Sequence, residues 1–197
     1  MTWPAVFDGI GALVVSSALD PKALLDKLDP ATTWIAPKLT GTDTGGDAEV
    51  RHCIDVWRAQ GLKVGGWVYN TGPPDDDVAS VSPWMPLDFL IYDIEAPYKS
   101  DEGGHYERAA ELVARSGVVF GKLPTAVTSY GGYKTSIDFA AFASAGWPIF
   151  AQGYDAFTCA DRLSYLAVYP PDGIHCLSRS LALEPGEAVY RPESIDG

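Results

Sequence analysis

The sequence holds few of the residues that build disulfide, metal or nucleic-acid sites. Its 197 residues include three cysteines and three histidines, without CxxC or HExxH spacing, so we expect reduced thiols and no zinc site. No run of about 18 apolar residues occurs, which predicts no membrane insertion. The chain has 14 Lys and Arg against 26 Asp and Glu. The resulting net charge of -12 disfavours nucleic acid and anionic membranes as partners.

Two further absences concern cofactors and export. Neither GxGxxG nor GxxxxGK[ST] is present, so the sequence predicts no nucleotide site and no other cofactor. The first residues, MTWPAVFDG, lack a basic segment followed by a long apolar one. We therefore expect synthesis in the cytoplasm without a signal peptide.

What the sequence does hold is the composition of a folded globule, with 47% hydrophobic and 20% charged residues. No change of composition marks a linker, so the length predicts one domain over residues 1–197, with 184–197 as a closing tail. Apolar runs typical of strands alternate with amphipathic segments typical of helices. The expected strands are 11–17, 32–39, 62–69, 87–95, 118–123, 147–154 and a segment within 173–183.

This alternation predicts βαβ units and a parallel sheet, the α/β class. Without a phosphate-binding motif, a single compact (β/α)8 TIM-like barrel is favoured over a doubly wound sheet. Such barrels take about 250 residues, so we expect this one to be irregular or to lack some helices. The stretch 71–83 is expected to be a loop with at most one turn of helix, and helices are expected at 47–61, at 106–117, after Ser136 and at 159–166.

The strongest chemical signal is the end of the expected strand 87–95. Asp93 and Glu95 share one face, about 6.7 Å apart along the strand, and the apolar run FLIY precedes them. Close, desolvated carboxyls raise each other's pKa, as glycoside hydrolysis requires of one proton donor and one ionised partner. The alternative is a pair of strand-end carboxylates held by Lys38 and Lys122, with no chemistry.

Further candidate side chains lie at or near the expected strand ends. The aromatic ones suit the flat faces of sugar rings or simply fill the core, the amides can bond hydroxyls, and the lysines can keep a carboxylate ionised or reach solvent. The predicted substrate-binding residues are Lys38, Trp67, Tyr69, Asn70, Lys122, Gln152, Tyr154 and Asp155.

Four segments also carry a family resemblance. IAPKLTGTD, GLKVGGWVY, FLIYDIE and WPIFAQGY resemble the second, third, fourth and a later strand of the family 25 glycoside hydrolases, the lysozyme-type muramidases. The resemblance implies a TIM barrel that cleaves bacterial cell-wall polysaccharide, with Glu95 as general acid and Asp93 as electrostatic partner. Similar barrels occur in bacteriophage tails and lysins, which implies a virion, and specifically a phage tail, as the setting.

The sequence also departs from that family. Val14 stands where the family has an aspartate in its first strand, and IHCLSRS has none near the last strand, unless Asp8 or Asp155 reaches the site from elsewhere. The alternative function is therefore a non-catalytic TIM barrel, a structural or receptor-binding component of a phage tail. Its partners would be other tail proteins or copies of itself.

Overall fold

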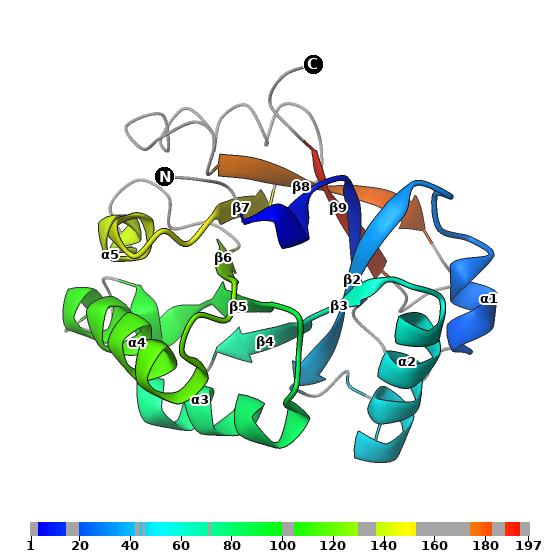
Figure 1. The fold of residues 1–197 in the computed structure, drawn as a ribbon. Helices are drawn as coiled ribbons and strands as arrows, with labels where there is room; N and C mark the ends of the chain where they lie inside the picture. Colours follow the sequence, from blue (N-terminus) through cyan, green and yellow to red (C-terminus); the bar gives the residue numbers. More distant parts are fainter. Residues whose placement is uncertain are drawn as a thin grey trace.

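The protein is a mixed α/β structure in which helices surround a curled sheet (Figure 1). The computed structural model describes residues 4–14, 20–41, 44, 46–70, 72–99, 105–129, 137–152, 174–182 and 188–193. The strands are β1 (Ile10–Val14), β2 (Thr32–Thr40), β3 (Lys63–Val64), β4 (Gly66–Asn70), β5 (Leu90–Ile94), β6 (Thr125–Ser129), β7 (Ile149–Gln152), β8 (Ile174–Ala182) and β9 (Ala188–Glu193).

Parallel pairing dominates the sheet. Neighbouring strands run parallel from β1 through β2, β4, β5, β6 and β7 to β8, while β9 lies antiparallel between β8 and β1. This agrees with the expected parallel α/β architecture. The described residues do not show the eightfold repeat of a complete (β/α)8 barrel, because the strand that follows β8 reverses direction.

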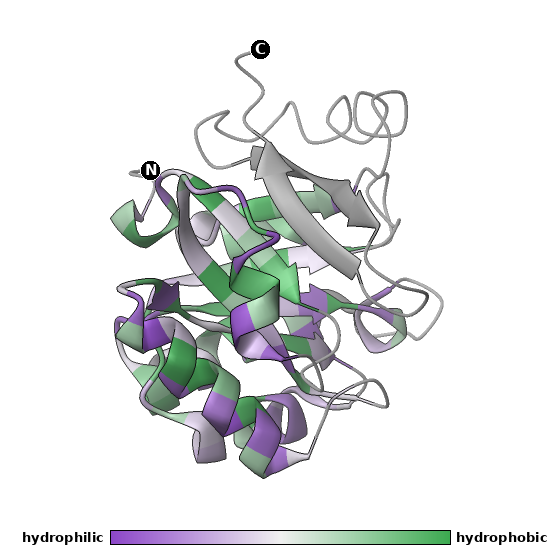
Figure 2. Ribbon diagram, turned by 90° about the vertical axis from the view of Figure 1, so that its right-hand side faces the viewer, coloured by the Kyte–Doolittle hydropathy of each residue, from purple (hydrophilic) through white to green (hydrophobic). Residues whose placement is uncertain are grey.

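The helices lie along the outside of the curled sheet (Figure 1). They are α1 (Pro21–Leu25), α2 (Asp47–Ala59), α3 (Pro74–Val81), α4 (His105–Phe120) and α5 (Phe139–Ser144), with short 3₁₀ turns η1 (Ala5–Phe7), η2 (Ser82–Trp84) and η3 (Ala96–Tyr98). Asp20 and Asp138 cap α1 and α5 by accepting backbone N–H bonds, as capping aspartates do. The helices in Figure 2 carry both hydrophobic and hydrophilic residues, as amphipathic helices do.

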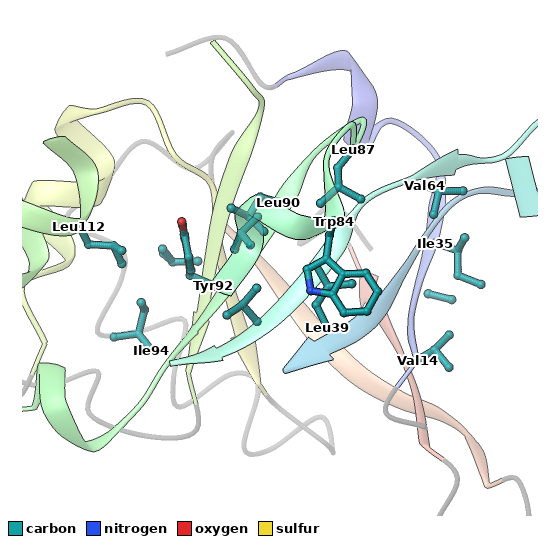
Figure 3. Close-up of a cluster of buried hydrophobic side chains, with 14 of the residues drawn as sticks. Val14, Ile35, Leu39, Val64, Trp84, Leu87, Leu90, Tyr92, Ile94 and Leu112 are labelled. Atoms are coloured by element: carbon teal, nitrogen blue, oxygen red, sulfur yellow. The ribbon is translucent and has the colours of Figure 1, made fainter. Parts of the chain in front are cut away.

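Successive side chains of each strand point to opposite faces of the sheet, so the apolar core has two sides. One side faces the helices, and Figure 3 shows part of it, with side chains of the sheet lying near Trp84 of η2 and Leu112 of α4. The other side faces the inside of the curl. That inner cluster comprises Phe7, Leu13, Trp34, Ala36, Trp67, Phe89, Ile91, Ala126 and Phe150.

The amino end of the inner space is filled by aromatic rings. Phe7, on η1, meets Phe89 and Phe150 edge-on, with ring centroids 5.0 and 5.4 Å apart. Trp34 Nε1 donates a hydrogen bond to the Phe7 carbonyl oxygen at 3.3 Å. Gly11 leaves room for the Trp34 ring, because a Cβ at Gly11 would lie 1.8 Å from its Cε2 atom. Polar chemistry inside the curl is thereby confined to the opposite end.

The prediction of a strand over 118–123 is wrong. Residues up to Phe120 continue α4, and the strand is β6, at Thr125–Ser129. A short apolar run cannot be assigned to strand or helix by periodicity alone. Val118 is 84% exposed, which no buried strand would allow. The helix ends only at Gly121, whose φ of +64° suits glycine.

Three other predictions also need correction. Residues Pro74–Val81 form an eight-residue helix rather than a loop, begun by proline at its first position and acidic residues in its first turn. The expected strand 62–69 divides into β3 and β4. The expected tail contains β9, whose backbone pairs with β1.

The expected strand within 173–183 is confirmed by β8. The expected helix at 159–166 lies outside the described residues. The expected cap at Ser136 is wrong, because α5 begins at Phe139 and Asp138 caps it. In the part of the chain that the structure describes, no helix has the length and apolar character needed to cross a membrane.

Candidate functional site

A layer of polar side chains lies on the inner face at the carboxyl ends of the parallel strands. Each member stands two positions after a residue of the inner apolar cluster, on the same face. Tyr69, Asp93 and Thr128 also occupy directly paired positions across β4, β5 and β6. We call Lys38, Tyr69, Asp93, Thr128 and Gln152 the polar layer.

Asp93 is the carboxyl of this layer and is buried, with 4% of its surface exposed. Gln152 Nε2 donates a hydrogen bond of 2.8 Å to Asp93 Oδ1. Burial raises the Asp93 pKa well above its usual value, and the negative charge of Glu95 raises it further. The Gln152 bond and the charges of Lys38 and Lys99 oppose this without cancelling it. Asp93 therefore keeps its proton where an exposed aspartate has lost it.

Glu95 follows β5 directly and has a different environment. Lys99 Nζ lies 2.7 Å from Glu95 Oε2, and the Glu95 side chain is 15% exposed. The ion pair spans the turn η3. The sequence reading missed Lys99, because spacing of four residues signals an ion pair only where a helix is expected. The two carboxyls thus differ. Asp93 is buried and accepts a hydrogen bond from an amide, whereas Glu95 is paired with an ammonium group.

Lys38 lies beside two aromatic rings. Its Nζ is 5.5 Å from the Trp67 ring centroid and 5.2 Å from that of Tyr69, within the range of cation–π attraction. A Cβ at Gly41 would lie 3.0 Å from Lys38 Cε, so the glycine leaves room for the lysine. Three predicted binding residues are therefore brought together, and Lys38 is 7% exposed.

Tyr69 connects this aromatic group to the carboxyls. Burial raises the Tyr69 pKa, and the negative charges of Glu95 and Asp93 raise it further, as expected for a phenol close to both acids. The residue is 37% exposed. Tyr69 is therefore the most exposed member of the group that it forms with Lys38 and Trp67.

Not every predicted site residue joins the polar layer. Lys122 is exposed in the turn between α4 and β6, at the amino end of β6 and hence the opposite end of the sheet; its placement followed from the misassigned strand. Asp8 precedes β1 and is likewise at the amino end. Asn70 is fully buried on the helix-facing side of β4. Tyr154 and Asp155 lie outside the described residues.

Thr128 was missed by the sequence reading. It is fully buried, and its Oγ1 donates a hydrogen bond of 2.7 Å to the Phe150 carbonyl oxygen. The segment TAVTS gives no clear alternation, because Thr128 shares a strand face with Ala126 whereas Thr125 and Ser129 lie on the other face. The expected strand was also placed too early to include Thr128.

Comparison of the chain with protein-family models, curated proteins and solved structures finds no match. No cluster of three or more His, Cys, Asp or Glu suited to a metal ion occurs within the described segments. The polar layer and Glu95 are the residues of the described segments on which a function can be proposed.

Proposed function

We propose that the protein is a lysozyme-like glycoside hydrolase that cleaves bacterial cell-wall polysaccharide from a TIM-like barrel, in the setting of a bacteriophage tail. The observation that carries the proposal is the unequal pair Asp93 and Glu95. Asp93 is buried, accepts a hydrogen bond from the Gln152 amide and has a raised pKa, whereas Glu95 is ion-paired with Lys99. Unequal environments are how a fold keeps one carboxyl protonated beside an ionised one.

The reaction needs one proton for the leaving oxygen and one negative charge for the oxocarbenium-like transition state. Asp93 and Glu95 interact electrostatically, so they share their protons as a pair. Glu95 is the more exposed of the two and delivers the proton to the glycosidic oxygen. In the resting protein burial holds the reacting proton on Asp93. This proton passes to Glu95 as the substrate binds, and the ionised Asp93 then stabilises the positive charge. Water then adds to the sugar carbon and returns its proton to the carboxyls.

The surroundings of the pair support a sugar substrate. The partly exposed ring of Tyr69 offers a flat apolar surface close to both carboxyls, and sugar rings stack on such surfaces through their C–H faces. Lys38 and Lys99 balance the two acids, since both charges act on Asp93. A neutral polyhydroxylated ligand would therefore meet little net repulsion at this end of the sheet.

The test is release of reducing ends from purified peptidoglycan. Glu95→Gln is expected to lower the rate about 10²–10⁴-fold, because the amide keeps the shape but cannot donate a proton. Asp93→Asn should lose nearly as much. Glu107→Gln and Asp55→Asn, which remove exposed carboxylates from α4 and α2, are the matched controls and should retain wild-type activity. A wild type that releases no reducing ends contradicts the proposal.

A second candidate, the non-catalytic structural or receptor-binding barrel, is favoured by one specific observation. Gln152 and Lys99 already hold the two carboxyls within the chain, as in a purely structural network. On this alternative, wild type and both carboxyl variants are equally inert on peptidoglycan. Asp93→Asn would then raise the thermal midpoint, because a buried acid is replaced by a neutral amide.

A further inference from the structure

A second buried polar group lies on the helix-facing side of the sheet, away from the polar layer. Tyr98, on η3, is fully buried and its hydroxyl donates a hydrogen bond of 2.7 Å to Asp77 Oδ2 on α3. Asp77 is 5% exposed, and its Oδ1 accepts a bond of 3.4 Å from the Gly72 N–H. Asp77 therefore ties α3 and the loop after β4 to η3.

The turn η3 is also the segment that carries Glu95 and Lys99. The Tyr98 N–H bonds the Glu95 carbonyl oxygen at 3.0 Å, and the Lys99 N–H bonds the Ala96 carbonyl oxygen at 3.0 Å. The side chains of Glu95 and Lys99 then close the ion pair across the turn. A fixed Tyr98 therefore restrains the backbone that carries the Glu95 and Lys99 side chains.

Neighbouring elements hold the turn from two directions. Arg108 of α4 donates a hydrogen bond to the Pro97 carbonyl oxygen, while Asp77 reaches Tyr98 from α3. These two helices lie side by side (Figure 1). Asn70, at the end of β4, adjoins the Tyr98 hydroxyl from the sheet.

We infer that Asp77 and Tyr98 are a positioning pair that holds the Glu95–Lys99 turn in its working geometry. The inference rests on the proposed function for the reaction that the geometry serves. Burying a carboxylate among apolar residues such as Val78 and Val81 is costly. The Asp77–Tyr98 bond offsets that cost and gives the turn a direction that apolar packing alone would leave less defined.

Tyr92 provides a matched control. It is also a fully buried tyrosine in the helix-facing core (Figure 3), and its hydroxyl hydrogen-bonds Ser116 Oγ at 2.8 Å. Its bond joins β5 to α4 and does not involve η3. Tyr98→Phe and Tyr92→Phe therefore each remove one buried hydroxyl, and only the first releases the turn.

The experiment compares these two variants with Asp77→Asn. Tyr98→Phe is expected to lower kcat on peptidoglycan about tenfold or more with KM within about twofold, since small misplacements of a reacting group cost rate. It should also shift the ¹³C resonance of the Glu95 carboxyl. Tyr92→Phe should do neither, although both variants lower the unfolding midpoint. Asp77→Asn keeps an acceptor for Tyr98 and should stay close to wild type in kcat.

Equal changes in kcat and in the Glu95 resonance for Tyr98→Phe and Tyr92→Phe would overturn the inference. The carbon resonance also separates this inference from the proposed function. If wild type is inert, the hydrolase proposal fails and the resonance alone decides: a shift confined to Tyr98→Phe supports the positioning pair, and an unmoved resonance rejects it.

Discussion

Asp93 shows how its surroundings change the chemistry of a single residue. The side chain of this aspartate is almost completely buried on the inner face of β5, where it accepts a hydrogen bond from the amide of Gln152. Glu95, two residues later, lies beside Lys99. Desolvation disfavours the charged form of Asp93 and so raises its pKa.

The raised Asp93 pKa predicts a definite pH dependence of stability. Unfolded aspartate loses its proton near a pKa of about 3.9, whereas folded Asp93 keeps it to higher pH. Between these two pKa values the native state binds more protons than the unfolded state. The contribution of Asp93 to the free energy of unfolding is therefore largest at low pH. It falls as pH rises, by up to about 1.4 kcal/mol per pH unit. Urea unfolding at several pH values measures this.

Asp93→Asn should remove that fall, and the difference between variant and wild type should grow from about pH 4 upward. The exposed Asp55→Asn serves as its control and should leave the slope unchanged. An Asp93→Asn variant with the wild-type slope would show that Asp93 is not the group responsible.

At the scale of elements, the end of α4 is the place where local pattern and structure disagree most. Gly117 lies inside the helix, and a Cβ added there would meet no atom within 4 Å. The following two valines are exposed. A glycine in a helix interior weakens the helix through its backbone freedom.

Gly117→Ala is therefore expected to stabilise the protein by about 0.5–1 kcal/mol, since alanine fits the helix and restricts the unfolded chain. Gly11→Ala is the contrasting variant. Its Cβ would overlap the Trp34 ring, and overpacking of this kind costs about 1–3 kcal/mol or more. Urea unfolding of both variants gives the comparison, and a destabilised Gly117→Ala would speak against a helix at this position.

At the scale of the whole molecule, the two ends of the inner space differ in the side chains that line them. The amino end is closed by Phe7 against Trp34, Phe89 and Phe150. The carboxyl end carries the polar layer. Separation of a packed end from a functional end is the usual division in parallel barrels, because the apolar end supplies stability without constraining the chemistry.

Phe7→Ala should lower the free energy of unfolding by about 3–5 kcal/mol, the cost of emptying a large aromatic site in a core. Val6→Ala, at the neighbouring partly buried position, should cost about 1 kcal/mol or less. Denaturant unfolding measures both. A small effect of Phe7→Ala, similar to that of Val6→Ala, would mean that η1 does not close the amino end.

The sequence by itself determined several elements and most residues of the candidate site. Hydrophobic periodicity located β1, β2, β5, β7 and α2. Each of these segments is long or apolar enough for its pattern to fit only a strand or only a helix. The position of Asp93 at the end of the expected strand 87–95 placed the acid at the carboxyl ends of the parallel strands, as the structure shows. Lys38, Tyr69 and Gln152 followed from the same reasoning about strand ends.

Only the tertiary structure decided which groups meet. Gln152 and Asp93 are 59 residues apart, and their hydrogen bond depends on the register of β5, β6 and β7, which no local pattern encodes. The misassigned strand at 118–123 placed Lys122 at the wrong end of the sheet. Lys99 became the partner of Glu95 through a 3₁₀ turn. Local patterns set which face a side chain takes, whereas strand pairing and turns set its neighbours, and the neighbours set its pKa.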